Sequence, residues 1–172
     1  MPERMLNVRT ICAIGGMTTI ALAMTGCVST GASNVYFLGL NEHAEPTPRT
    51  VEGNMNYVGY SREYEKDDWG FENGVNTYED SYGQQSYTIF SRVSHKQYQT
   101  KYVVPVVSFN CSYKGRSYEN DSMKLICTPP VSFRVGGEKG FFAHITPVPK
   151  LGNLTNGFIM AEIGYRFRKK AD

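Results

Sequence analysis

Apolar and polar residues alternate near the end of this chain. The odd-numbered face comprises Ile159, Ala161, Ile163, Tyr165 and Phe167, and the even-numbered face Met160, Glu162, Gly164, Arg166 and Arg168. A period of two places successive side chains on opposite faces of a β-strand. In a membrane barrel one face meets lipid and the other a polar lumen, whereas the edge strand of a soluble β-sandwich alternates between core and water. The pattern predicts a strand and leaves both surroundings open.

Similar alternation recurs along the chain between clusters of Gly, Asn, Asp and Pro. We expect eight strands, at residues 34–43, 53–64, 70–79, 85–94, 100–111, 123–134, 140–148 and 157–167. After the first apolar segment, no run approaches the ~18 consecutive apolar residues of a membrane-spanning helix. The sequence therefore predicts an all-β fold, an eight-stranded antiparallel outer-membrane β-barrel.

Two inner strands differ in how clearly their faces separate. In the fourth, Ile89 and Val93 lie opposite Thr88 and Arg92. The fifth is apolar on both faces, so its sides are not assigned. Eight strands leave a lumen that side chains fill or that holds one small ligand. We therefore do not expect the barrel to form an open pore.

The connections between the expected strands alternate in length. The tight ones are 65–69, 94–99 and 135–139, and the longer, more polar ones are 44–52, 112–122 and 149–156. Outer-membrane barrels have short periplasmic turns and longer external loops. We therefore expect both ends of the barrel segment at the periplasmic rim.

The first segment has the character of an export signal. Arg4 and Arg9 precede an apolar stretch at 11–24 that is too short to span a membrane. Ala21-Leu22-Ala23 fits a small-residue cleavage site, and Met24-Thr25-Gly26-Cys27 resembles a bacterial lipobox, in which Cys27 would carry lipid. The sequence does not decide between these two cleavage sites. The expected organisation is a signal peptide at 1–26, a short linker at 27–33, the barrel at 34–168 and a tail at 169–172.

The cysteines agree with export. Cys12 leaves with the signal, and if Cys27 is acylated, Cys111 and Cys127 remain as a pair. An oxidising compartment allows them to bond. We predict this disulfide at the external ends of strands five and six; two free thiols are the alternative.

Composition narrows the function. The 172 residues suffice for one domain, and a formal net charge of +2 gives no field that favours nucleic acid. We expect no metal site and no cofactor. We expect the protein to be a monomer in the cell outer membrane. Its expected partners there are phospholipid and lipid A.

Several short motifs occur in a suggestive order. Residues 59–70 combine a Gly-x-Ser-Arg strand end with a charged turn that closes on Trp69, and Asp-Ser-aromatic follows at 80–82. The later matches are 129–133, 145–149, 156–157 and 165–167. Over roughly residues 55–167 this set resembles the outer-membrane lipid A palmitoyltransferase family (PagP).

The resemblance implies an eight-stranded barrel that transfers a palmitoyl chain from phospholipid to lipid A, with a His, an Asp and a Ser at its external rim. Asp80 and Ser81 match that motif, and His43 lies at the external end of the first strand. His43 would act as the general base, Asp80 would orient it, and Ser81 would stabilise oxyanion charge. His95 and His144 are poorer candidates, since the strand order places them away from this rim.

Asp80 to Gly83 is also good turn chemistry, and His43 suits a solvated loop. A non-enzymatic envelope barrel or barrel-like lipoprotein with a structural role is therefore the alternative function, and a soluble lipocalin-like lipoprotein a third. The lumen discriminates between them. An apolar cavity open to the external half would favour the enzyme. A structural plug would consist of Glu72, Asn76, Arg92, Arg134, Glu162 and Arg166.

Overall fold

A computed structural model describes residues 28–44, 53–80, 83–116, 120–150 and 156–168. Ten strands and one short 3-10 helix occur in these ranges. The elements are β1 (Val28–His43), β2 (Gly53–Asn54), β3 (Val58–Lys66), β4 (Trp69–Glu79), β5 (Gln85–His95), the 3-10 helix (Lys96–Tyr98), β6 (Val103–Arg116), β7 (Asn120–Thr128), β8 (Val131–Gly136), β9 (Gly140–Lys150) and β10 (Asn156–Arg168). No helix in the described ranges is long and apolar enough to cross a membrane.

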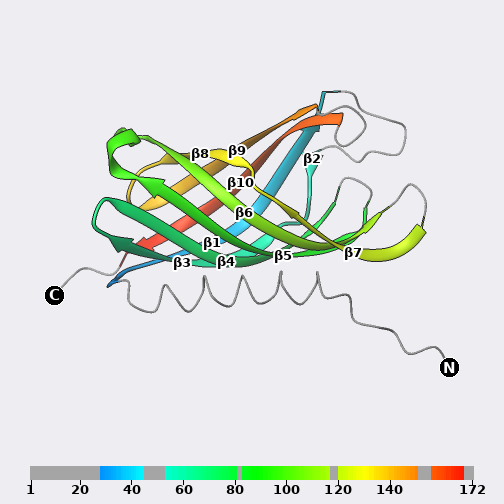
Figure 1. The fold of residues 1–172 in the computed structure, drawn as a ribbon, viewed down its shortest axis with the longest axis horizontal. Helices are drawn as coiled ribbons and strands as arrows, with labels where there is room; N and C mark the ends of the chain where they lie inside the picture. Colours follow the sequence, from blue (N-terminus) through cyan, green and yellow to red (C-terminus); the bar gives the residue numbers. More distant parts are fainter. Residues whose placement is uncertain (1–27, 45–52, 81–82, 117–119, 151–155, 169–172) are drawn as a thin grey trace.

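Eight of the strands form a closed antiparallel ring in the order β1, β3, β4, β5, β6, β8, β9, β10 (Figure 1). The ring closes where β10 pairs with β1, from Ala32↔Arg168 to His43↔Phe158. Closure gives the backbone groups of the ring strands neighbours on both sides and removes sheet edges. The predicted eight-stranded antiparallel barrel is confirmed.

The two remaining strands extend ring members. β2 pairs with β1 and, with β3, occupies the second expected segment. β7 pairs with β6 and precedes β8, from which Pro129 and Pro130 separate it. Proline has no N–H for the ladder, so a strand is readily interrupted there.

The barrel has two ends, which we name by their connections. The turn rim carries the β3–β4, β5–β6 and β8–β9 connections, the start of β1 and the end of β10, at the left of Figure 1. The loop rim carries the ends of β1, β4, β6 and β9 and the starts of β5, β7 and β10. β1 begins at Val28, six residues before the expected first strand, so most of the expected linker at 27–33 belongs to the sheet.

The expectation of a long loop at 112–122 is wrong. β6 continues to Arg116 and β7 begins at Asn120, so a β-hairpin extends the sheet at the loop rim. Its last described pair is Arg116↔Asn120. Most side chains in this segment are polar on both faces, so the sequence carries no period-two signal there.

The faces follow the predicted alternation. On β10, Ile159 and Phe167 are exposed, while Glu162 and Arg166 are buried. On β6, whose sides the sequence left unassigned, Val104 and Val106 point inward, while Val107 and Phe109 are exposed. Both strands therefore present an exposed apolar face and an opposite face that borders the lumen.

Aromatic rings in the lumen lie against glycines of neighbouring strands. A Cβ at Gly74 would lie 2.4 Å from Cζ of Phe90, and one at Gly164 would lie 2.8 Å from Cζ of Phe142. At Gly39 it would lie 2.8 Å from Cβ of Tyr57. The missing side chains provide the space in which these rings pack.

We therefore predict that Gly74→Val destabilises the barrel by about 1–3 kcal/mol, because it overpacks a filled interior. Unfolding in urea, followed by the fluorescence of the single tryptophan, Trp69, measures the change. Gly137→Ala is the control, because a Cβ there meets only the Lys139 carbonyl oxygen at 3.6 Å. Equal stability of the two variants would contradict this packing.

Candidate functional site

Charged side chains fill the part of the lumen nearer the turn rim. Three cations and three anions point inward from five different strands, and they are Arg92, Arg134, Arg166, Glu63, Glu72 and Glu162. All except Arg134 are buried to at least nine-tenths. An unpaired ion in such surroundings is costly, so each must be matched by an opposite charge.

Arg92 of β5 joins two of the carboxylates. It donates a charge-assisted hydrogen bond to Glu162 of β10, and its Nη1 lies 3.6 Å from Oε1 of Glu72 on β4. Nη1 also donates to the hydroxyl of Tyr36, at 2.7 Å. The guanidinium lies 4.2 Å from the ring centre of Phe90, within cation–π range. One side chain thus ties together strands from different parts of the ring.

Glu63 of β3 holds the other two arginines. It accepts from Nη2 of Arg166 and from Nη1 of Arg134, the latter at 3.2 Å. The Asn34 amide donates to Glu63 at 2.9 Å and to Glu72 at 3.1 Å, which joins the two halves of the network. Ser61 donates to Glu72 at 2.5 Å. Hydrogen bonds of this kind are needed before a buried ion pair offsets its desolvation cost.

An aromatic layer lies next to the charges. Tyr36, Tyr57, Phe90 and Phe142 form the buried hydrophobic cluster, and Tyr36 meets Phe142 edge-on with ring centres 5.3 Å apart. The hydroxyls of Tyr36 and Tyr57 donate to Glu72 and Glu162, respectively. These rings combine apolar packing with donors for the carboxylates.

A cavity of about 640 Å³ opens at the turn rim. Its lining includes Glu63, Arg92, Arg134 and Arg166, together with residues 99–102 of the β5–β6 connection. The charge network is therefore the floor of this cavity. The lumen nearer the loop rim has the buried apolar Met55 beside buried polar groups, and these are Asn41, Ser86, Thr88 and Thr146.

The expected catalytic residues lie towards the loop rim. His43 ends β1 and its ring centre is 5.4 Å from that of Phe158. Asp80 is buried and has a turn role, accepting the Gln84 backbone N–H at 3.0 Å. Ser81 and the predicted lipidation site Cys27 lie outside the described residues. Their catalytic and lipidation roles stay predictions.

The two other histidines are where the strand order placed them. His95 ends β5 at the turn rim and packs against Trp69, with ring centres 4.6 Å apart. His144 on β9 is completely buried, with Nε2 3.6 Å from Oε2 of Glu72. His144 therefore belongs to the charge network.

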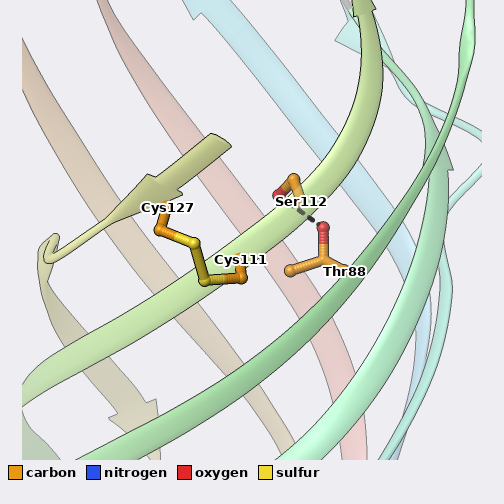
Figure 2. The surroundings of a disulfide bond; sticks show 4 residues. All are labelled: Thr88, Cys111, Ser112 and Cys127. Carbon is orange, nitrogen blue, oxygen red and sulfur yellow. Dashed lines mark hydrogen bonds between the residues drawn. A yellow bond between two sulfur atoms is a disulfide. The ribbon is translucent and has the colours of Figure 1, made fainter. Parts of the chain in front are cut away.

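The predicted disulfide between Cys111 and Cys127 is present (Figure 2). The two residues are direct partners of β6 and β7, with Cα atoms 4.1 Å apart. Beside it, the hydroxyls of Thr88 and Ser112 are hydrogen-bonded between β5 and β6, at 2.6 Å. The bridge therefore fixes the base of a hairpin.

Several members of the network were missed in the sequence. Asn34, Tyr36 and Glu63 face inward with the residues that alternation did identify. Glu63 shares its face with Gly59 and Ser61, so the period-two pattern of its strand could have found it. The sequence does not show which carboxylate pairs with which arginine, because this depends on which strands face each other across the lumen.

We predict that Arg92→Met destabilises the protein by about 3–5 kcal/mol, because it leaves Glu72 and Glu162 without their shared cation. Urea unfolding of protein inserted in lipid vesicles measures it. Glu65→Gln is the matched control, since it breaks the exposed pair with Lys96, at 3.9 Å. A change within about 0.5 kcal/mol is expected for the control. If Arg92→Met also changes the free energy of unfolding by no more than about 0.5 kcal/mol, the network does not stabilise the barrel.

Replacing both disulfide cysteines by serine should lower stability by about 3 kcal/mol, because the bridge closes a loop with a sequence separation of 16. The unfolding midpoint of oxidised wild type is compared with that of Cys111→Ser/Cys127→Ser. Reductant should lower the midpoint of the wild type only. If reductant shifts both proteins equally, the bridge is not the cause.

Comparison with known proteins shows likeness at the level of structure. No family model matches the chain, and no curated protein matches it. The outer membrane protein Ail of Yersinia pestis, in a phospholipid bilayer nanodisc, aligns with a TM-score of 0.49 and 14% identity over 80% of this chain and 99% of that one. The N-terminal β-barrel domain of Pseudomonas aeruginosa OprF aligns with a TM-score of 0.44 and 15% identity over 81% of this chain and 99% of that one.

The resemblance to the lipid A palmitoyltransferase family is wrong. The Ail and OprF barrels are among the solved structures to which this chain is similar, and no family model or curated protein supports the assignment. Its motifs have structural explanations. Asp80 closes the β4–β5 turn, and Ser61 and Trp69 belong to the β3–β4 hairpin. Short motifs of turn and strand residues therefore recur without shared chemistry.

Proposed function

We propose that this protein is a non-enzymatic outer-membrane β-barrel with a sealed lumen and a structural role in the envelope. The observation that carries the proposal is the balanced charge network, which crosses the lumen and forms the charged floor of the cavity at the turn rim. Arg92 and Glu162 lie at its centre.

The exterior supports a place in a membrane. Exposed apolar side chains occur on every strand of the closed ring, and examples are Val35, Tyr60, Val75, Ile89, Val107, Phe133, Phe141 and Ile159. Aromatic residues are exposed at both ends: Trp69, Tyr98 and Tyr102 near the turn rim, Tyr87 and Tyr113 nearer the loop rim. An apolar band between aromatic girdles is typical of outer-membrane barrels. By the same convention the turn rim would face the periplasm.

The interior favours a structural role over an enzyme. The residues expected of a plug face inward, and Glu72, Asn76, Arg92, Glu162 and Arg166 are buried. The lumen towards the loop rim is lined in part by buried polar groups, whereas an acyl pocket requires mainly apolar walls. A closed ring without free edges also supports a monomer, surrounded by phospholipid and lipid A.

The hairpin of β6 and β7 is the part that this barrel would present outside the cell. It extends beyond Tyr113, which pairs with Tyr87 on β5, and Cys111–Cys127 fixes its base. A disulfide stabilises such a segment in an oxidising compartment. Anchoring this hairpin is the structural role that the geometry supports.

We predict that the protein fractionates with outer membranes, migrates heat-modifiably on gels and gives no steady conductance in planar bilayers. The reason is that a closed barrel inserts as a unit, while the network blocks its lumen. Arg92→Ala/Glu162→Ala, which removes the central pair and much volume, should conduct. Stable open channels in the wild type, or recovery of the protein as a soluble monomer without detergent, would refute the proposal.

A further inference from the structure

A polar row crosses the outer surface of the barrel on four adjacent strands. Ser33 of β1 pairs with Arg62 of β3, Arg62 with Asn73 of β4, and Asn73 with Ser91 of β5. All four side chains point away from the lumen, since their neighbours in sequence Asn34, Ser61, Glu63, Glu72 and Arg92 are buried inside it. The row is therefore on the face that lipid would contact.

Apolar rows flank it on both sides. Towards the loop rim, the same four strands carry Val35, Tyr60, Val75 and Ile89 in register. Towards the turn rim, β3, β4 and β5 carry Tyr64, Phe71 and Val93 in register. The polar row is thus embedded in the apolar band, where a lipid-facing cation costs up to about 2–4 kcal/mol at the bilayer midplane.

Arg62 is exposed, and no carboxylate among the described residues pairs with it. Two hydroxyls share its row: Ser33, the partner of Arg62 on β1, accepts from the Tyr60 hydroxyl at 3.2 Å, and Ser91 lies two strands away on β5. Lys66, on the same outer face of β3, is also exposed. A cation among hydroxyl donors is suited to an anion with several acceptor oxygens.

We propose that this row binds the phosphate group of a phospholipid in the periplasmic leaflet, held between Arg62 and Lys66. The inference rests on the proposed membrane location. Four residues of β3 separate the two cations, which is about 10 Å along the barrel axis at ordinary strand rise and tilt. Lys66 ends β3 at the turn rim, so both side chains can reach one headgroup while their stems stay in the apolar band.

Native mass spectrometry of the folded protein in detergent, titrated with dioleoylphosphatidylglycerol, tests the proposal. The wild type should bind one lipid tightly, and Arg62→Gln should weaken that binding on the order of tenfold, because it removes a charge-assisted contact. Arg62→Lys should retain part of the affinity. Lys139→Gln, which removes an exposed cation from the β8–β9 connection at the same rim, should leave it unchanged. Dioleoylglycerol, which lacks the phosphate, should not bind at this site.

Equal binding by wild type and Arg62→Gln, or equal loss in Lys139→Gln, would overturn the proposal. Stronger Arg62-dependent binding of lipid A would also overturn it, by assigning the row to the external leaflet. An Arg62-dependent dimer in crosslinking would show that a second copy covers the row. Heat-modifiable migration is recorded for every variant, so a failure to form the membrane barrel is distinguished from an inserted barrel without the lipid site.

Discussion

Charge balance inside a closed ring is the constraint on which this structure depends. Eight strands leave a narrow interior that side chains can fill, and this sequence places three arginines and three glutamates there. Each carboxylate meets at least one guanidinium, and Asn34, Ser61 and the two tyrosines supply further donors. Removing one partner would leave its opposite charge buried and unpaired. The contribution of each member to stability therefore depends on the presence of the others.

The network also determines what the barrel can do. Its members come from β1, β3, β4, β5, β8, β9 and β10, so it holds the ring across its width as well as around its circumference. The glycines of the same strands admit the aromatic rings that complete the filling. The network forms the floor of the cavity of about 640 Å³ at the turn rim, so a group that enters this cavity meets charged side chains.

Much of the fold could be predicted from the sequence, because a period of two is a direct consequence of strand geometry. Glu162 and Arg166 were placed in the lumen on that basis, and so was Arg92. The hairpin around Arg116 was missed because most of its residues are polar on both faces. The disulfide could be predicted because Cys111 and Cys127 were the pair that remained after export.

The site could be predicted only in part. Alternation shows which residues face inward, but which carboxylate meets which arginine depends on register and closure, which one sequence does not contain. The expected catalytic set rested on a family resemblance carried by short turn and strand motifs. That resemblance is wrong, so the roles of His43, Asp80 and Ser81 stay predictions. Asp80 also accepts the Gln84 backbone N–H in the β4–β5 turn.

Solid-state NMR on protein in phospholipid bilayers can show directly whether Arg92 and Glu162 pair inside the lumen. With arginine side chains labelled with ¹⁵N and glutamate carboxyls with ¹³C, dipolar recoupling measures the distance between the Arg92 guanidinium and the Glu162 carboxylate. We expect a contact within about 4 Å that disappears in Glu162→Gln. A separation beyond about 6 Å, with the coupling unchanged by that substitution, would show that the lumen is not closed by this pair.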